Sequence, residues 1–440
     1  MKLVETKNGT IAGVEKDGYT LFLGVPYAKP PVGELRWRAP VEAEPWEGVY
    51  QADHYPNRSM QDREGAGPFF DKEFDHSAEL RTPYSEDSLY LNIWTPATKA
   101  GEKLPVAFWI HGGAFLGGFG HEKEFDGEAY CRRGVILVTS NYRLGPLGFL
   151  AHPWLTAENR EDGGPGVSGN YGSLDQIAAL KWVRENIGAF GGDPDNITVF
   201  GQSAGGESAH TLVSSQLTKG MISKAIIQSG LGLTCDRTLA EAEQDGLEFA
   251  AIAQVNSLAE MRAMEPGQIF AAAGPLIGRG FARNSMTFAP NIDGMLLTEG
   301  YDSTMENGRT HDIPYMTGCT MQDIRVDPEK LAQGDKGIVY DTCKRWGQAQ
   351  LDHARTPSYL YYFTRQLPGD DAGAFHSAEL WYMFGTLGRN WRPNTEDDYK
   401  LSAEMLDYWT NFMKCGNPNG NGLTEWRPYH EDGDIKILDI

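Results

Sequence analysis

A glycine–serine–glycine turn between a buried strand and a helix is the feature that most constrains this fold. Residues 197–210 are ITVFGQSAGGESAH: a short β-branched run, a Gly-x-Ser-x-Gly, and small residues that begin a helix. A serine on such a sharp turn exposes its hydroxyl at the end of a strand, and glycines at 201 and 205 avoid collisions with the neighbouring strand and helix. The segment predicts an α/β fold in which Ser203 is either a nucleophile or the N-cap of a tight turn.

Buried strands recur along the chain as continuous apolar runs. The clearest cover residues 104–113, 134–143, 197–203, 223–230, 311–320 and 358–366. Between them, residues 171–192 have apolar side chains at helical spacing and stop at paired glycines. The alternation of strands and helices predicts one mainly parallel sheet covered by helices on both faces.

Two regions depart from that alternation. Residues 9–28 predict two or three short antiparallel strands joined by glycine turns, which make a small N-terminal sheet. Residues 236–290 are rich in Ala and Glu and helical in character, so they form either a cap above the sheet or covering helices. No repeat or low-complexity linker divides the chain, and we expect residues 1–440 to form a single α/β domain.

The net charge of −21 argues against two classes of partner. Such a surface repels nucleic acid and anionic lipid. No apolar run approaches the length of a membrane span, and the N-terminus has no apolar signal region. None of the five cysteines has the spacing of a metal or redox motif. We therefore expect a cytoplasmic protein without nucleic-acid or membrane partners, and the sequence indicates no oligomeric state.

A nucleophilic serine needs a base to remove its proton, and histidine is the usual one. On this kind of sheet the chain order is serine, acid, histidine. The histidines considered after Ser203 are His311, His353, His376 and His430. His376 is preferred because it lies in a loop of small residues that leads into the aromatic-rich segment HSAELWYMFG.

The acid is expected at the carboxyl end of a strand that precedes His376. Residues 313–323 offer a strand, a glycine and then Asp323. A buried carboxylate that accepts the imidazole N–H fixes the tautomer and stabilises the imidazolium. The competing carboxylates are Asp327, Asp293 and Asp302.

The glycines that follow residues 104–110, in the segment WIHGGAFLGG, predict an oxyanion hole. The backbone N–H groups of Gly113 and Ala114 can approach a substrate oxygen, joined by the N–H of Ala204. Each such donor typically lowers the barrier by about 3 kcal/mol. The alternative is an ordinary glycine-rich turn.

Apolar and aromatic side chains near these motifs suggest a pocket for apolar or aryl groups, although they are equally suited to the core. They are Phe115, Leu116, Phe119, Trp381 and Met383. No metal or cofactor is expected, because HEKEF at 121–125 lacks the second histidine of a zinc motif.

These stretches together resemble the type-B carboxylesterases, an α/β-hydrolase family that includes bacterial para-nitrobenzyl esterases and, more distantly, cholinesterases. Landmarks run from FLGVPYAKPPVGELRWRAP through SEDSLYLNIWTP, NYRLGPLGFL and FGQSAGG to YWTNFMKCGNPN, so the resemblance covers nearly the whole chain. It implies the α/β-hydrolase fold, an oxyanion hole and a catalytic triad of Ser203, His376 and an acid. Asp323 stands where the family usually has Glu.

The sequence departs from that family in two informative ways. Ser59 and Ser88 stand where secreted relatives have disulfide cysteines, which agrees with a reducing compartment. Gln202 stands where cholinesterases have Glu, and no Trp lies between Ser59 and Ser88. Without that aromatic platform, choline esters are poor candidates.

The expected function is that of a serine carboxylesterase, which hydrolyses small-molecule esters with apolar, bulky or aryl groups through an acyl-enzyme. One alternative is an amidase or carbamate hydrolase on the same scaffold. The other is a non-catalytic binding relative. Such relatives usually lose the nucleophile or the histidine, whereas this chain has both Ser203 and His376.

Overall fold

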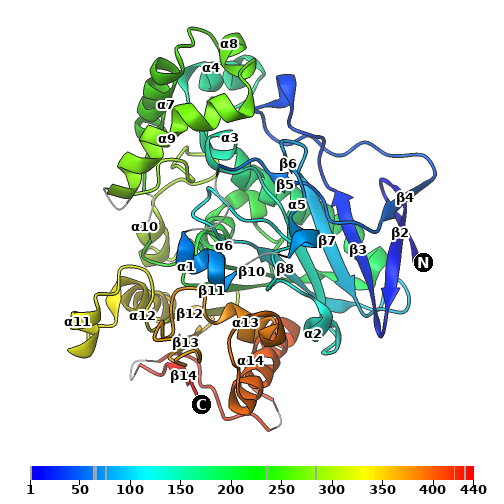
Figure 1. The fold of residues 1–440 in the computed structure, drawn as a ribbon, viewed down its shortest axis with the longest axis vertical. Coiled ribbons are helices and arrows are strands. Elements are labelled where there is room, and N and C mark those ends of the chain that lie inside the picture. Colours follow the sequence, from blue (N-terminus) through cyan, green and yellow to red (C-terminus); the bar gives the residue numbers. More distant parts are fainter. Residues whose placement is uncertain are drawn as a thin grey trace.

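A mixed β-sheet runs through the molecule (Figure 1). The computed structural model describes residues 2–62, 67–74, 77–233, 236–282, 285–420, 422–430 and 433–440. In these residues twelve strands form one sheet, in the order β1-β2-β3-β7-β9-β8-β10-β11-β12-β13-β14, with β4 paired to β2. Its strands are β1 (Lys2–Thr6), β2 (Gly9–Lys16), β3 (Tyr19–Pro26), β4 (Val49–Ala52), β7 (Tyr90–Thr95), β8 (Leu104–Ile110), β9 (Ile136–Ser140), β10 (Gly192–Gln202), β11 (Lys224–Gln228), β12 (Tyr315–Thr320), β13 (Tyr359–Phe363) and β14 (Lys436–Leu438).

The strands β9-β8-β10-β11-β12-β13-β14, in this spatial order, pair in parallel and form the major part of the sheet. The neighbours β1, β2, β3 and β7 pair antiparallel, and β7 joins them to the parallel part through β9. The N-terminal antiparallel strands are therefore present as expected, but they extend the main sheet and do not form a separate one. A small second sheet pairs β5 (Arg58–Ser59) with β6 (Tyr84–Ser85).

Both faces of the sheet are buried, as the central strand β8 shows. Its Val106, Phe108 and Ile110 belong to one hydrophobic core. The alternating Ala107 and Trp109 belong to the other. Successive side chains of a strand point to opposite faces, so a strand buried on both sides is apolar throughout. This explains the continuous apolar runs in the sequence.

Helices cover both faces. On one face lie α5 (Tyr171–Asn186), α6 (Ala204–Ser214) and α12 (Gly337–Asp352). On the other lie α2 (Glu128–Cys131), α13 (Leu380–Met383) and α14 (Glu396–Cys415). A capping box of Thr395 and Asp398 starts α14, and Gly416 in the left-handed conformation ends it.

The remaining helices lie around the sheet. They are α1 (Pro68–Glu73), α3 (Gly145–Phe149), α4 (Pro153–Glu161), α7 (Leu239–Ala253), α8 (Leu258–Arg262), α9 (Pro266–Ala282), α10 (Tyr301–Glu306) and α11 (Pro328–Ala332). Short 3₁₀ turns cover Gly33–Leu35, Ala78–Leu80, Ile187–Phe190, Gln216–Thr218 and Leu387–Arg389.

Residues 236–282 form α7, α8 and α9 at one end of the molecule, beside α3 and α4 (Figure 1). α9 packs on α7 and α3. Whether these helices act as a cap stays a prediction at this point.

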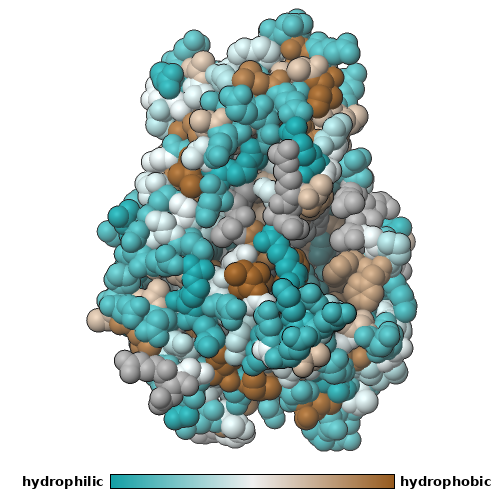
Figure 2. All heavy atoms as spheres, turned by 90° about the vertical axis from the view of Figure 1, so that its left-hand side faces the viewer, coloured by the Kyte–Doolittle hydropathy of each residue, from teal (hydrophilic) through white to brown (hydrophobic). Residues whose placement is uncertain are grey.

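The exterior fits the high net charge. Figure 2 shows a face on which hydrophilic side chains predominate and hydrophobic ones occur in small groups. Within the described part of the chain, none of the helices has both the length and the apolar character needed to cross a membrane.

Candidate active site

The Ser203 turn joins β10 to α6 in a strained conformation. Ser203 has φ 58° and ψ −128°, which costs a non-glycine residue about 1–3 kcal/mol. Its N–H donates to the carbonyl of Gln228 on the neighbouring strand at 2.9 Å. A Cβ on Gly205 would lie 2.0 Å from the carbonyl oxygen of Ile110, so the motif's second glycine lets α6 pack directly on β8. The half-buried Ser203 thus stands at the carboxyl end of β10 and at the N-terminus of α6.

Asp323 and His376 are brought together at the neighbouring strand ends. Asp323 follows β12, its side chain is 1% exposed, and its Oδ1 lies 2.5 Å from Nδ1 of His376. The hydroxyl of Ser229 donates to Oδ2 at 2.7 Å, and the N–H groups of Thr320 and Ile324 also donate to the carboxylate. Burial alone would raise the pKa of Asp323, but His376 and the donors Ser229 and Ile324 hold it below its ordinary value. Asp323 is therefore held as a carboxylate.

The imidazole of His376 also contacts Gln202. The side-chain amide nitrogen of Gln202 lies 3.2 Å from Nε2 of the imidazole. Among the hydrogen bonds between described residues, none joins the Ser203 hydroxyl to His376. The amide nitrogen of Gln202 also lies 3.5 Å from Nδ1, so it stands over the face of the ring. The structure thus brings Asp323 and His376 together beside the Ser203 turn, with Gln202 packed on the imidazole.

The competing acids and histidines of the sequence lie elsewhere, each with its own partner. Asp327 accepts from the N–H of Glu329 at the start of α11. The other contacts are Asp293 with Asn170, Asp302 with Arg345, His311 with Ser215, His353 with Glu306, and His430 with Asp434.

A glycine-rich loop after β8 approaches the serine. A Cβ on Gly112 would lie 3.2 Å from Cβ of Ser203. The following Gly113 and Ala114 have φ values of 105° and 55°. Between described residues, no hydrogen bond uses the N–H of either, and Ala204, the first residue of α6, has no intrahelical acceptor for its N–H. The loop and the start of α6 thus leave three N–H groups available beside Ser203.

The chain matches a known protein family over its whole length. A model described as the carboxylesterase family matches residues 1–338 and 332–440. The chain belongs to the carboxylesterase family.

Individual relatives agree with this assignment. A fumonisin B1 esterase of Sphingopyxis macrogoltabida is 34% identical over 99% of this chain and 86% of its own length. A para-nitrobenzyl esterase of Bacillus subtilis (strain 168) is 34% identical over 98% of this chain and 93% of its own length. The solved structure of a PNB esterase superposes with a TM-score of 0.86 at 31% identity, covering 100% of this chain and 96% of that one. The protein is therefore a serine ester hydrolase with an α/β-hydrolase fold.

A small cavity opens next to the glycine-rich loop of this carboxylesterase. Ala114 and Leu116 form one wall, and Ile277 and Phe281 of α9 with residues 285–288 form the other. The sequence analysis named Leu116 but missed the second wall. The sequence signal for this wall was the helical segment 236–290. Its position next to the loop could not be predicted, because it depends on tertiary packing.

The other predicted pocket residues of the esterase are largely buried in its hydrophobic cores. Phe115 packs edge-on against Phe149. Trp381 and Met383 are fully buried in the core beneath α14. Phe119 packs against His121 and is 3% exposed. The sequence left open whether these four residues line a pocket or belong to the core. Their burial favours the core.

Sequence reasoning also missed a second buried carboxyl near the site. Glu379 follows His376 by three residues and is fully buried. The amide of Gln228 donates to its Oε1 at 3.4 Å. Burial, and next to it the charge of Asp323, raises the pKa of Glu379 to about 7. The esterase thus has a second titrating group close to its histidine.

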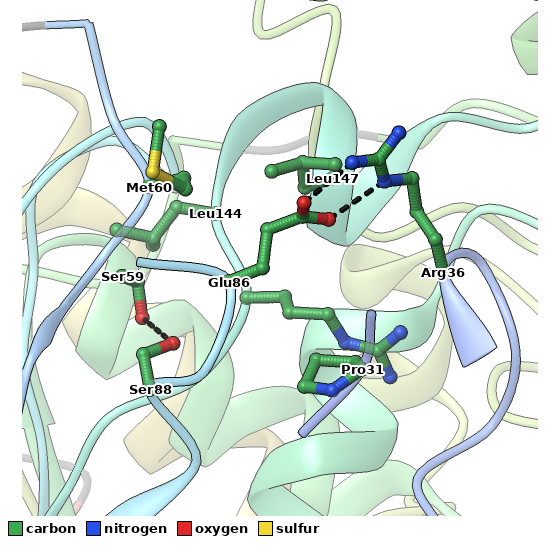
Figure 3. A pocket seen from close by; sticks show the side chains of 9 residues that line it. Pro31, Arg36, Ser59, Met60, Glu86, Ser88, Leu144 and Leu147 are labelled. Carbon is green, nitrogen blue, oxygen red and sulfur yellow. Dashed lines mark hydrogen bonds and ion pairs between the residues drawn. The ribbon is translucent and has the colours of Figure 1, made fainter. Parts of the chain in front are cut away.

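Ser59 and Ser88 line a separate small cavity (Figure 3). Their hydroxyl oxygens lie 3.0 Å apart, and Ser59 also donates to the carbonyl of Tyr142 at 2.8 Å. On the far side of this cavity Arg36 pairs with Glu86. In this carboxylesterase a hydrogen bond thus joins the two positions where the resemblance implied a disulfide in secreted relatives.

Proposed function

We propose that Ser203, His376 and Asp323 form the catalytic triad of this esterase and that Gly113, Ala114 and Ala204 form its oxyanion hole. The observation that carries the proposal is the strained Ser203 turn, which stands beside three unpaired N–H groups and next to the Asp323–His376 pair. Strain of this kind is retained where it positions a reacting group.

The geometry supports hydrolysis in two half-reactions. His376 takes the proton of Ser203 as the serine oxygen attacks the ester carbonyl, and the three N–H groups stabilise the oxyanion. The imidazolium, held by Asp323, then protonates the leaving alcohol. Water attacks the acyl-enzyme by the same route and releases the acid.

We propose esters with apolar, bulky or aryl groups as substrates. The cavity beside Ala114 supports this, because Leu116, Ile277, Phe281 and Phe288 contribute apolar side chains to its lining, next to the polar Ser285 and Thr287. One relative is named for the para-nitrobenzyl group, which is aromatic. In this proposal α7–α9 serve as a cap, since α9 supplies one of the walls.

A panel of esters tests the proposal on the wild type and on Ser203→Ala. We expect kcat/KM to rise from acetyl esters of small alcohols to esters of bulky or aromatic groups. We expect Ser203→Ala to lose at least about a thousandfold in kcat with an unchanged melting temperature. Activity confined to short straight-chain acetyl esters would overturn the substrate proposal. Undiminished activity of Ser203→Ala would overturn the proposed nucleophile.

A matched amide separates the esterase from an amidase on the same scaffold. An aryl ester and the aryl amide of the same acid differ only in the leaving group. The proposal predicts a much larger kcat/KM for the ester, whereas an amidase would hydrolyse both at comparable rates.

A further inference from the structure

The cavity beside Ala114 must widen before it can hold a bulky ester group. As it stands, it is far smaller than the roughly 150 Å³ cavity that admits benzene in an engineered apolar core. Leu116 lies on one side of it, and Ile277 and Phe281 of α9 lie on the other. An aromatic ring therefore enters only if one of these two walls moves.

The wall that carries Leu116 is held in place. The N–H of Leu116 donates to the carbonyl of Gly113 at 2.9 Å. The preceding residue, Phe115, is fully buried, and its carbonyl accepts from the N–H of Gly145 at 2.6 Å. The same loop supplies two of the proposed oxyanion-hole donors, which act only when they are fixed in position. Movement is therefore expected on the side of α9.

The two parts of α9 are anchored to different extents. The buried residues within 266–273 are Ile269, Phe270, Ala272 and Ala273. Phe270 packs at the start of α3, where a Cβ on Gly145 would lie 3.2 Å from its ring. Within 274–282 the buried residues are Leu276 and Gly280. The part of the helix that lines the cavity is thus the less deeply buried part.

The polar contacts of residues 274–282 are compatible with movement. Arg279 pairs with Asp245 and Glu248 of α7, and all three side chains are partly exposed to solvent. Exposed ion pairs of this kind contribute little to stability. The hydroxyl of Thr287 donates to the carbonyl of Leu276 at 2.9 Å. Thr287 also lines the cavity, so it belongs to the same wall and can move with it.

Gly274, Pro275 and Gly278 weaken the helix where the two parts meet. Pro275 has no N–H to donate to the carbonyl of Ala271, so one helical hydrogen bond is missing. A Cβ on Gly274 or Gly278 would meet nothing within 4 Å, and neither residue has a positive φ. Neither packing nor backbone conformation requires glycine there, although glycine destabilises a helix interior. Together these three residues have the properties of a hinge.

We propose that Gly274, Pro275 and Gly278 are specificity-determining residues, because they let residues 274–282 of α9 move away from Leu116 and open the cavity to bulky ester groups. The inference rests on the proposed function, which places such a group in this cavity. Ile277 and Phe281 are then the side chains of α9 that contact the entering group.

The test is kcat/KM of the full chain for ethyl acetate, benzyl acetate and ethyl benzoate, which are a small ester, one with a bulky alcohol and one with a bulky acid. The variant is Gly274→Ala/Gly278→Ala. Gly267→Ala is its matched control, because a Cβ there also meets nothing within 4 Å but lies in the first turn of α9. Thermal unfolding should show that neither protein is less stable than the wild type.

Alanine makes the closed helix more stable and the open state rarer. We therefore expect the double variant to lose about tenfold in kcat/KM for benzyl acetate, ethyl benzoate or both. Its kcat/KM for ethyl acetate, and all three values for Gly267→Ala, should stay within about twofold of the wild type. Leu116→Ala added to the double variant removes bulk from the fixed wall and should recover most of the lost activity.

Three outcomes overturn the inference: unchanged kcat/KM of the double variant for both bulky esters, an equal loss for ethyl acetate or in Gly267→Ala, or no recovery with Leu116→Ala. The wild type distinguishes these failures from failure of the proposed function. If it hydrolyses neither bulky ester, the proposed substrate class is wrong. If it hydrolyses them and the double variant does so equally well, only the hinge is wrong.

Discussion

Asp323 shows how a buried carboxylate can be kept charged. Four donors reach its two oxygens, from His376, Ser229, Thr320 and Ile324. The sequence predicted this residue because it follows a strand and a glycine, a pattern that places a side chain at a strand end. It could not predict Ser229, whose hydroxyl reaches Asp323 from the end of β11, the strand that pairs with β12 in the sheet.

Substitutions at Asp323 should separate charge from shape. Asp323→Asn should lose about a thousandfold in kcat, because the amide cannot stabilise the imidazolium. Asp323→Glu keeps the charge but adds a methylene to a filled site, so we expect a smaller activity loss and about 1–3 kcal/mol of destabilisation. Steady-state kinetics and urea unfolding of both variants measure this. An Asn variant as active as the Glu variant would argue against the proposed role of the carboxylate.

Glu207 is a buried carboxyl of the opposite kind. It lies in the first turn of α6 and is 1% exposed, and neither of its oxygens has a hydrogen-bond partner among the residues that the structure describes. Burial raises its pKa to about 8, although Arg325 opposes the rise. The folded state therefore favours the protonated form. In the unfolded chain the group ionises near 4.5. Its contribution to stability is fully present below that value and is lost as the pH rises towards 8.

Glu207→Gln removes this pH dependence. We expect the stability of the variant relative to the wild type to grow by about 1.4 kcal/mol for each pH unit between pH 5 and 8. Urea unfolding at four pH values in that range measures the difference. A difference that stays constant with pH would show that Glu207 is ionised in the folded protein.

At the scale of elements, the strand–turn–helix of β10 and α6 was predictable because its signals are local. Strand propensity, the two glycines of the Gly-x-Ser-x-Gly motif and a helix start lie within fourteen consecutive residues, 197–210. The union of the N-terminal strands with the main sheet was not predictable in the same way. It depends on the pairing of β7 with β9, which are distant in sequence.

Two glycine substitutions test how closely α6 must approach the sheet. In Gly205→Ala the new Cβ would meet the carbonyl oxygen of Ile110 at 2.0 Å, so we expect severe destabilisation and loss of activity. In Gly278→Ala, at an exposed position of α9, a Cβ meets nothing within 4 Å. There we expect a gain of about 0.5–1 kcal/mol from helix propensity. Thermal unfolding of the two variants measures these changes in stability. Equal changes in the two variants would contradict the proposed packing of α6 on β8.

At the scale of the whole molecule, the Ser59–Ser88 contact closes a long loop without a covalent bond. The two hydroxyl oxygens are 3.0 Å apart, and both residues are buried. Ser59→Cys/Ser88→Cys should therefore form a disulfide under oxidising conditions. Closing a loop of about 30 residues should stabilise the protein by about 3–4 kcal/mol.

The oxidised and reduced forms of this double variant are compared by urea unfolding. Ser59→Cys alone serves as the control for the loss of the hydroxyl. Failure to form the bond, or a bond that leaves stability unchanged, would show that the backbone at these positions does not have disulfide geometry.

The arrangement of the whole molecule also explains why the sequence did not predict the second wall of the cavity beside Ala114. Leu116 could be assigned to the pocket because it lies in the glycine-rich motif. Ile277 and Phe281 reach the same cavity from a helix more than 150 residues further along the chain. No local pattern connects the two, because only the packing of α9 against the molecule places them together.

The most direct test of the account is covalent labelling of the esterase with a fluorophosphonate, followed by peptide mass spectrometry, on the wild type and on folded His376→Ala. The account predicts a single adduct, on Ser203, and a labelling rate at least about a thousandfold lower in the variant. An adduct on another residue, or equal labelling rates in the two proteins, would contradict it.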